Sequence, residues 1–216
     1  MHLVDVFYNK YYLPTVINRN KLRKRNTNKE FSLFTGNCMG GYIYHQLGLK
    51  FKSPTINLMI LQPDFYKLVS NLEYYMSLPL VQKKSGEGVL QASLGDLTIN
   101  FTHYSSFEEA SEAWHKRAKR INYEQVYIIA TDRDGITEED IAKLGNLKCK
   151  KLIVFTAKKY DYPYCFQIKE YQDQECIGNI LGKTVFGKWR FEKFFDFVGW
   201  LNSSDKVAEH FKIGKN

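Results

Sequence analysis

Short unbroken apolar runs alternate with helical stripes of apolar residues along most of the chain. The unbroken runs predict strands at residues 31–34, 55–61, 125–130 and 151–155. The stripes predict helices over about 42–47, 63–76, 107–120, 137–147 and 189–202. Two further runs, at 89–92 and 96–101, predict a hairpin. Strands that alternate with helices are typical of an α/β protein with a mostly parallel sheet.

The helix over 107–120 has the clearest pattern. At about 100° per residue its apolar side chains fall within one arc, which predicts that Trp114 is part of the core. Lys116, Lys119 and Arg120 point to the opposite side, and Arg117 lies at the border. The next helix is expected to begin at Thr137, a residue suited to cap it, with acidic residues in the first turn.

The chain is expected to hold one α/β domain, over residues 31–202. Aromatic and β-branched residues at 1–18 predict a lead-in helix or arm, and 19–30 are interpreted as a polar, basic connector. Residues 203–216 are interpreted as a C-terminal tail. The 216 residues are enough to bury a core without disulfides or metals.

The charge balance favours anionic binding partners. With 31 Lys and Arg against 23 Asp and Glu, the chain carries a formal charge of +8, which attracts phosphates, nucleic acid or an anionic membrane. The basic clusters at 19–29 and 116–120 are equally explained as solvated faces. Nucleic acid is not the expected partner, because the one aromatic of the 114–120 segment falls on the face opposite the cations.

The location is expected to be cytoplasmic. The four cysteines form no C-x-x-C pair and no secreted disulfide pattern, so reduced thiols are the simplest account. The start shows no signal peptide, and the apolar stretch 55–61 is too short to span a bilayer. Contact with a membrane would be peripheral at most.

The first candidate site is the turn from Asn37 to Gly41, after the first predicted strand. Ligands of open α/β sheets bind beyond the carboxyl ends of strands, and Gly40 and Gly41 allow a close approach to an anion at a helix start. Cys38 is a candidate nucleophile there. A tight turn with a small buried cysteine is the alternative, and neither glycine-rich nucleotide-binding fingerprint is met.

Two further candidates follow later strands. His103 is placed to act as a general base, although a structural histidine explains it equally well. Asp132 and Asp134 follow the most buried strand at i and i+2, as in transferases that hold Mg²⁺ or Mn²⁺ against a diphosphate. The alternative is an Asp-rich turn that leads to the Thr137 cap.

Six strings in a fixed order resemble an uncharacterised bacterial family, a domain of unknown function often labelled exopolysaccharide or capsule biosynthesis protein. The strings are Asn37-Cys38-x-Gly40-Gly41, Ser53-Pro54-Thr55-Ile56-Asn57-Leu58, Phe101-x-His103-Tyr104, Trp114-x-x-Arg117-x-x-Arg120-Ile121-Asn122, Asp132-Arg133-Asp134-Gly135 and Phe195-Asp196-Phe197-Val198-x-Trp200-Leu201-Asn202. The resemblance covers about residues 31–202. It implies a three-layer sandwich around a Rossmann-like sheet and a cytoplasmic role in building a surface polysaccharide. The resemblance implies no particular reaction.

These observations lead us to expect a transferase that acts on a sugar nucleotide or a phosphate-linked glycan. His103, Cys38 and Asp132 are the catalytic candidates, and Asp132 and Asp134 the metal ligands if a metal is used. Ligand contacts are expected from Asn37, Gly40, Gly41, Tyr104, Arg117, Arg120 and Asn122. The alternative is a non-catalytic accessory protein that binds a glycan or a biosynthetic partner, an interpretation favoured by the tyrosines at 160, 162, 164 and 171.

Overall fold

A parallel four-stranded sheet forms the centre of the molecule. The computed structural model describes residues 12–83, 88–182, 184 and 188–214. The strands, in the order β1-β5-β6-β7, are β1 (Ser32–Thr35), β5 (Val126–Thr131), β6 (Lys151–Thr156) and β7 (Cys165–Gln167). Every residue of the first three is buried, as expected for unbroken apolar runs in a parallel sheet. The predicted α/β class with a mostly parallel sheet is therefore confirmed.

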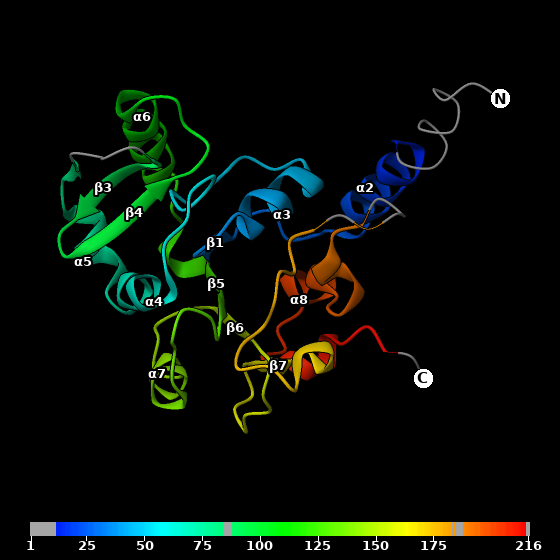
Figure 1. The fold of residues 1–216 in the computed structure, drawn as a ribbon. Helices are drawn as coiled ribbons and strands as arrows, with labels where there is room; N and C mark the ends of the chain where they lie inside the picture. Colours follow the sequence, from blue (N-terminus) through cyan, green and yellow to red (C-terminus); the bar gives the residue numbers. More distant parts are fainter. Residues whose placement is uncertain (1–11, 84–87, 183, 185–187, 215–216) are drawn as a thin grey trace.

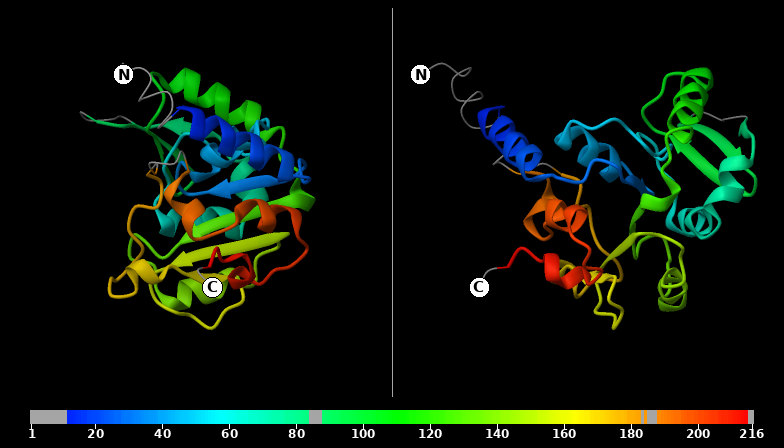
Figure 2. Two further views of the ribbon diagram at one scale, coloured as in Figure 1. Left: turned by 90° about the vertical axis from the view of Figure 1, so that its right-hand side faces the viewer. Right: turned by 180° about the vertical axis from the view of Figure 1, so that it is seen from behind.

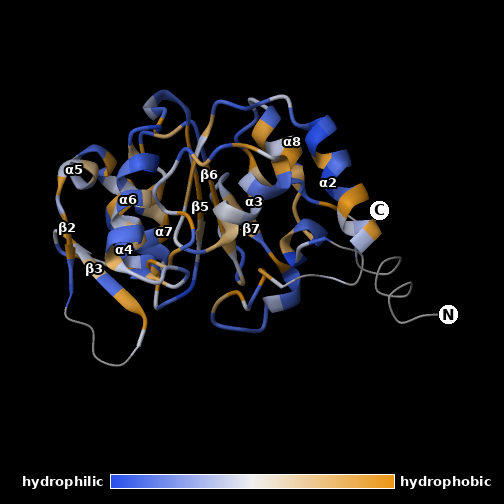
Figure 3. Ribbon diagram, turned by 90° about the horizontal axis from the view of Figure 1, so that it is seen from above, coloured by the Kyte–Doolittle hydropathy of each residue, from blue (hydrophilic) through white to orange (hydrophobic). Residues whose placement is uncertain are grey.

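Both faces of this sheet are covered, which gives three layers (Figure 1; Figure 3). One face carries α3 (Met39–Leu47) and α8 (Phe197–Asn202), and α2 (Leu13–Arg25) packs against α3. The other carries α4 (Gln62–Ser70), α5 (Leu72–Ser77), α6 (Phe107–Ala118) and α7 (Glu138–Leu144). A small antiparallel sheet lies on that same face, built from β2 (Leu80–Gln82), β3 (Leu90–Leu94) and β4 (Leu97–Phe101). The small sheet and α6 lie at one end of the molecule and α2 at the other (Figure 2).

Short 3₁₀ turns complete the chain. They are η2 (Tyr123–Gln125), η3 (Lys169–Tyr171), η4 (Arg190–Lys193) and η5 (Ala208–Phe211). The last of these packs beside β7, the edge strand of the main sheet. Within the described residues, no helix combines the length and the apolar character that a bilayer crossing requires.

Local sequence signals explain two of the helices. Thr137 caps α7 in a capping box, because its hydroxyl accepts the Asp140 amide and the Asp140 carboxylate accepts the Thr137 amide. Ser106 caps α6 through the Glu109 amide. As predicted from the spacing, Trp114 is buried while Lys116 and the other basic residues of that face are exposed.

Residues 55–61 are the clearest wrong prediction. They form no strand, and only Met59 makes an isolated bridge, with Asn100. Asn57 adopts a left-handed backbone conformation, with φ of 62°, which an extended strand cannot accommodate. The run is an irregular segment instead, in which Ile56, Leu58 and Ile60 are buried while Met59 and Leu61 are exposed.

Two predicted helices are interrupted. The one over 63–76 divides into α4 and α5 at Asn71, whose φ of −141° and ψ of 58° are not helical. The one over 189–202 divides into η4 and α8. α2 continues to Arg25, so the first part of the stretch predicted as a basic connector is helical. The first eleven residues of the predicted arm lie outside the described residues.

One buried lysine stands out in the core behind the sheet. Lys151 opens β6 and is only 3% exposed, and its ammonium donates a hydrogen bond to the Trp200 carbonyl. The ammonium lies 5.5 Å from the centre of the Trp200 ring and 5.0 Å from that of Phe211. Burial lowers the pKa of Lys151 from 10.5 to about 8, although the charge of Asp205 opposes the shift. The folded state therefore disfavours a protonated lysine here.

We expect Lys151→Met to stabilise the protein near neutral pH. Between pH 8 and 10.5 the unfolded chain binds more protons than the folded one, so the wild type gains stability as the pH rises through this window. Below pH 8 the buried charge lowers the stability of the wild type by at most about 3 kcal/mol, and the variant is free of this cost. The variant gives up about 1 kcal/mol of that gain, because the Trp200 carbonyl loses its hydrogen-bond donor.

Urea unfolding at several pH values measures this difference. The stability gap between Lys151→Met and wild type should be largest at pH 7 and shrink toward pH 10.5. Taking the difference removes the contributions of tyrosines and cysteines that titrate in the same range. A gap that stays constant over this range would contradict the assignment.

Candidate functional site

A crevice opens at the carboxyl edge of the main sheet, between the neighbouring strands β1 and β5. The chain after β1 turns into α3 on one face of the sheet, and the chain after β5 turns toward α7 on the other. Because the two connections diverge, they leave a space between them, which is where open α/β sheets bind ligands.

The crevice has a volume of about 280 Å³ and mixed chemistry. Gly36 and Asn37 line it from β1, and Thr131, Arg133 and Asp134 line it from β5. The remaining wall consists of Met59, Ile60, Gln62 and residues 177–181. Apolar side chains thus face a small group of hydrogen-bonding side chains.

A thiol and an imidazole meet beside this crevice. The Sγ atom of Cys38 lies 3.3 Å from Nε2 of His103, although the two residues are 65 positions apart. Cys38 is the N-cap residue of α3 and follows Asn37, which lines the crevice. Both side chains reach solvent, and Cys38 does so only partly. A nucleophile and a base at this separation are the usual constellation of covalent catalysis.

The small sheet delivers His103 to this position. Met59, in the crevice wall, exchanges two backbone hydrogen bonds with Asn100 of β4, at 2.8 and 2.9 Å. His103 follows the end of β4 by two residues, so this bridge brings it over the start of α3.

The thiol is not an activated thiolate at rest. Burial raises the pKa of Cys38 above its ordinary value of 9.0, and a hydrogen bond with Thr102 opposes the rise only in part. Cys38 therefore carries its proton at neutral pH. Reaction at sulfur would require the proton to move, and the Nε2 atom of His103 is the neighbouring acceptor.

The two glycines of the predicted anion turn serve packing. A Cβ at Gly40 would come 3.0 Å from Oγ1 of Thr35, and one at Gly41 would come 3.2 Å from the side chain of Asn57. The amide of Gly40 donates to that same Thr35 hydroxyl, and both glycines are buried. Asn37 accepts the Met39 amide at 2.9 Å through Oδ1.

Asp132 holds the backbone together at the crevice. The residue is 4% exposed, and its two carboxylate oxygens accept the amides of Ala157 and Ile177 at 2.7 and 2.9 Å. Burial raises the pKa of Asp132, and these two hydrogen bonds offset part of the shift. The carboxylate thereby links the ends of β5 and β6 to the segment that closes the crevice.

Asp134 lines the crevice from an unusual backbone conformation, with φ of 61°. Its carboxylate accepts the Gln62 amide at 3.1 Å, so the two aspartates predicted as metal ligands each bind backbone amides of different segments. Across the described ranges of the chain, no cluster of three or more His, Cys, Asp or Glu side chains is suited to hold a metal. The metal site stays a prediction.

Tyr104 and Arg117 support the wall near His103. The Arg117 guanidinium donates to the Ile56 carbonyl at 2.9 Å and to the Tyr104 hydroxyl, and it lies 5.1 Å from the centre of the Phe51 ring. These contacts fix the irregular segment that follows α3. The structure thus gives Arg117 protein partners rather than an open position in the crevice.

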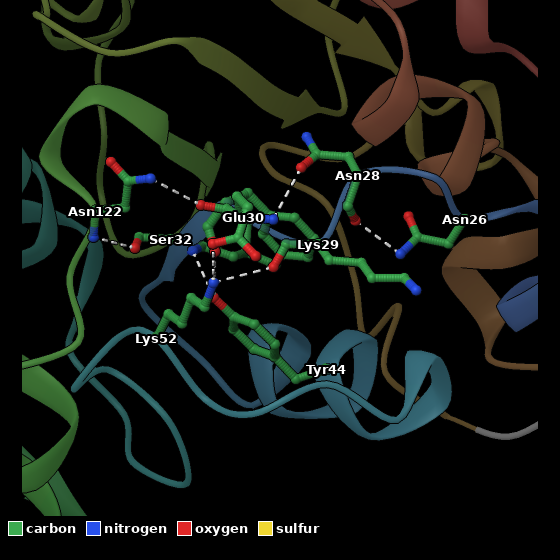
Figure 4. Close-up of polar contacts among 10 residues, drawn as sticks. Asn26, Asn28, Lys29, Glu30, Ser32, Tyr44, Lys52 and Asn122 are labelled. Atoms are coloured by element: carbon green, nitrogen blue, oxygen red, sulfur yellow. Dashed lines mark hydrogen bonds and ion pairs between the residues drawn. The ribbon is translucent and has the colours of Figure 1, made fainter.

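Arg120 and Asn122 lie at the amino ends of the strands, opposite the crevice. Asn122 donates from its side chain to the Glu30 carbonyl, and its amide donates to the hydroxyl of Ser32, the first residue of β1 (Figure 4). Arg120 reaches the Phe51 carbonyl at 3.4 Å. The predicted ligand set is therefore divided, since these two residues are at the amino ends of the strands and the crevice is at the carboxyl ends.

Several residues of the site carry no recognisable sequence signal. Gln62 is buried and joins the start of α4 to the end of β5. Its side-chain Oε1 accepts the backbone amide of Thr131, and its backbone amide donates to the Asp134 carboxylate. Arg133 and residues 177–181 also line the crevice. The one sequence signal for Arg133 is its position just after a buried strand. Residues 177–181 lie in a loop-rich stretch that shows no such signal.

Comparisons with known proteins agree with the resemblance in its coarser part. An uncharacterized protein of Haemophilus influenzae (strain ATCC 51907 / DSM 11121 / KW20 / Rd) is 35% identical to this chain over 190 residues, which covers 86% of the chain and 90% of that relative. The model of one family, described as Domain of unknown function (DUF1919), matches residues 9–202. That match begins before the predicted domain and includes α2 with its basic residues. The chain therefore belongs to the DUF1919 family.

Proposed function

We propose that this protein is a cytoplasmic transferase of surface-polysaccharide assembly, for exopolysaccharide or capsule, that acts on a sugar nucleotide or a phosphate-linked glycan. The polysaccharide part rests on the sequence resemblance. The transferase part rests on one observation, the Cys38–His103 pair beside a crevice at the carboxyl edge of the sheet.

The geometry supports a base at His103. In a sugar transfer, an acceptor oxygen bonds to the anomeric carbon, the bond from that carbon to the phosphate oxygen breaks with its electron pair, and a base takes the proton of the acceptor. Nε2 of His103 faces the Cys38 thiol, so it is the acceptor for the proton of whichever nucleophile is used. Arg133 lies in the crevice and is the cation placed to face the phosphate, in place of Arg117 or Arg120.

Ligand-induced stabilisation tests this proposal. A sugar nucleotide at about ten times its dissociation constant should stabilise the fold by ~1.4 kcal/mol, which raises the melting temperature by about 3–6 °C for a chain of this size. The same compound should slow alkylation of Cys38 by iodoacetamide, read by mass spectrometry, with Cys149 as the internal reference. Scans with and without Mg²⁺ or Mn²⁺ test the metal prediction. The absence of a shift with every sugar nucleotide would argue against a transferase.

The accessory-protein alternative has its own structural support. A second cavity, of about 730 Å³, is lined by Tyr160, Tyr162 and three lysines, and lies beside the edge strand rather than at the crevice. The rings of Tyr162 and Tyr164 are stacked, with centres 5.5 Å apart. Binding of a glycan at this cavity, with no dependence on His103, would favour the alternative.

A further inference from the structure

We infer that the crevice between β1 and β5 binds one phosphorylated sugar unit, with the phosphate at Arg133 and a hydroxyl at Thr131. This inference deepens the proposed transferase function and rests on it. It names the part of the substrate that the crevice takes, and it can be tested by binding alone.

Polar groups of the crevice have hydrogen-bonding capacity that the protein does not use. The guanidinium of Arg133 is exposed and, within the described residues, makes no hydrogen bond or ion pair. The side chain of Asn37 uses its oxygen to accept the Met39 amide, so its amide nitrogen remains as a donor. A guanidinium and an amide that both line the crevice match the acceptor oxygens of a phosphate.

Thr131 provides an independent observation. This residue lines the crevice and is 2% exposed, and its Oγ1 has no hydrogen-bond partner among the residues that the structure describes. Its backbone groups are satisfied, because the amide donates to Gln62 and the carbonyl accepts from Tyr66. A buried hydroxyl without a partner costs free energy, and a ligand hydroxyl would recover that loss once the Thr131 side chain turns its closed-off Oγ1 toward the crevice.

Size and lining favour a sugar phosphate over a larger group. The volume of about 280 Å³ lies just below the range of pockets that enclose drug-sized ligands, so a complete sugar nucleotide would extend outside. Ile177 and Ile180 offer an apolar wall for the C–H face of a sugar ring, and the Asp134 carboxylate can accept from ring hydroxyls. Among the described residues Arg133 is the one cation that lines the crevice, which matches a single phosphate.

Titration calorimetry with glucose 1-phosphate as the probe tests the inference. We expect Arg133→Gln to weaken binding ~10–100-fold, as for the loss of a charged hydrogen bond. Thr131→Val should weaken it ~5–10-fold without lowering the melting temperature, since the hydroxyl makes no bond within the described structure. Lys119→Gln, on the exposed face of the α6 end, removes the same charge away from the crevice and should leave binding unchanged.

Three further probes separate the sources of binding. Glucose alone and inorganic phosphate alone should each bind more weakly than the sugar phosphate. Uridine monophosphate binding more tightly than glucose 1-phosphate, with the same loss in Arg133→Gln, would overturn the inference in favour of a nucleotide site. Failure of glucose 1-phosphate to bind would also overturn it.

The two proposals fail in different ways. Calorimetry needs no turnover, so sugar-phosphate binding with the expected variant effects would uphold the crevice even if His103 proved dispensable for transfer. Conversely, transfer that depends on His103 without any effect of Arg133→Gln would uphold the transferase and reject the crevice.

Discussion

Replacing His103 with alanine is expected to slow transfer by ~10²–10⁴-fold while leaving the fold intact. A positioned general base contributes a factor of this size, and the proposal assigns that role to Nε2 of His103, 3.3 Å from the Cys38 thiol. The imidazole is exposed, so its loss should leave the melting temperature within about a degree of wild type. The rate would be measured with the sugar nucleotide that stabilises the protein, and polymer would be measured in a producing strain.

A matched control lies on α6. His115 is also exposed, and its ring contacts the Ser111 carbonyl at 2.7 Å, so His115→Ala removes the same side chain away from the crevice. Unchanged polymer in His103→Ala would support the accessory role instead. Cys38→Ala then shows which group gives its proton to His103. If the thiol is the nucleophile, Cys38→Ala should slow transfer as much as His103→Ala does. If a hydroxyl of the acceptor is the nucleophile, Cys38→Ala should slow transfer much less.

Removing the Asp132 carboxylate is expected to destabilise the protein by about 3–5 kcal/mol. Both oxygens accept buried backbone amides, of Ala157 and Ile177, and Asp132→Ala leaves those two donors without partners. For a chain of this length the melting temperature should fall by roughly 10 °C or more. Thermal and urea unfolding measure both quantities.

Two variants define what that loss means. Asp173→Ala removes an exposed carboxylate and should change stability by less than about 0.5 kcal/mol. Asp132→Asn keeps one acceptor oxygen but turns an NH₂ group toward the second amide, so an intermediate loss is expected. Burial raises the pKa of Asp132 above its ordinary value of 3.8, so the folded protein binds this proton more tightly than the unfolded chain does. The contribution of Asp132 to the free energy of unfolding therefore falls as the pH rises from 3.8 to the raised pKa. A loss below about 1 kcal/mol in Asp132→Ala would show that the carboxylate does not hold the two segments.

Much of the fold was predictable because its strongest elements have strong local signals. The run Val126–Thr131 has no polar interruption before its last residue, and Thr137 with Asp140 forms the cap that the sequence indicates. The errors have equally local causes. An apolar run does not distinguish a strand from buried irregular backbone, and the left-handed Asn57 decides between them at 55–61. Strands β2 and β7 have three residues each, too short to show a period.

The site was predictable only where topology constrains it. The carboxyl ends of parallel strands meet at one edge, which brings Asn37 near Arg133 and Asp134. Whether a carboxylate faces ligand or backbone depends on distant segments, and Ile177, which binds Asp132, comes from a stretch without a pattern. The same rule applies to Asn122, which precedes β5 and therefore lies at the amino ends of the strands, away from the crevice.

The bridge between Met59 and Asn100 joins the wall of the crevice to the strand that leads to His103. Two backbone hydrogen bonds form this bridge, so the wall of the crevice and the end of β4 keep one separation. The distance between the imidazole and sulfur is thus set in part by backbone contacts that lie outside the pair itself.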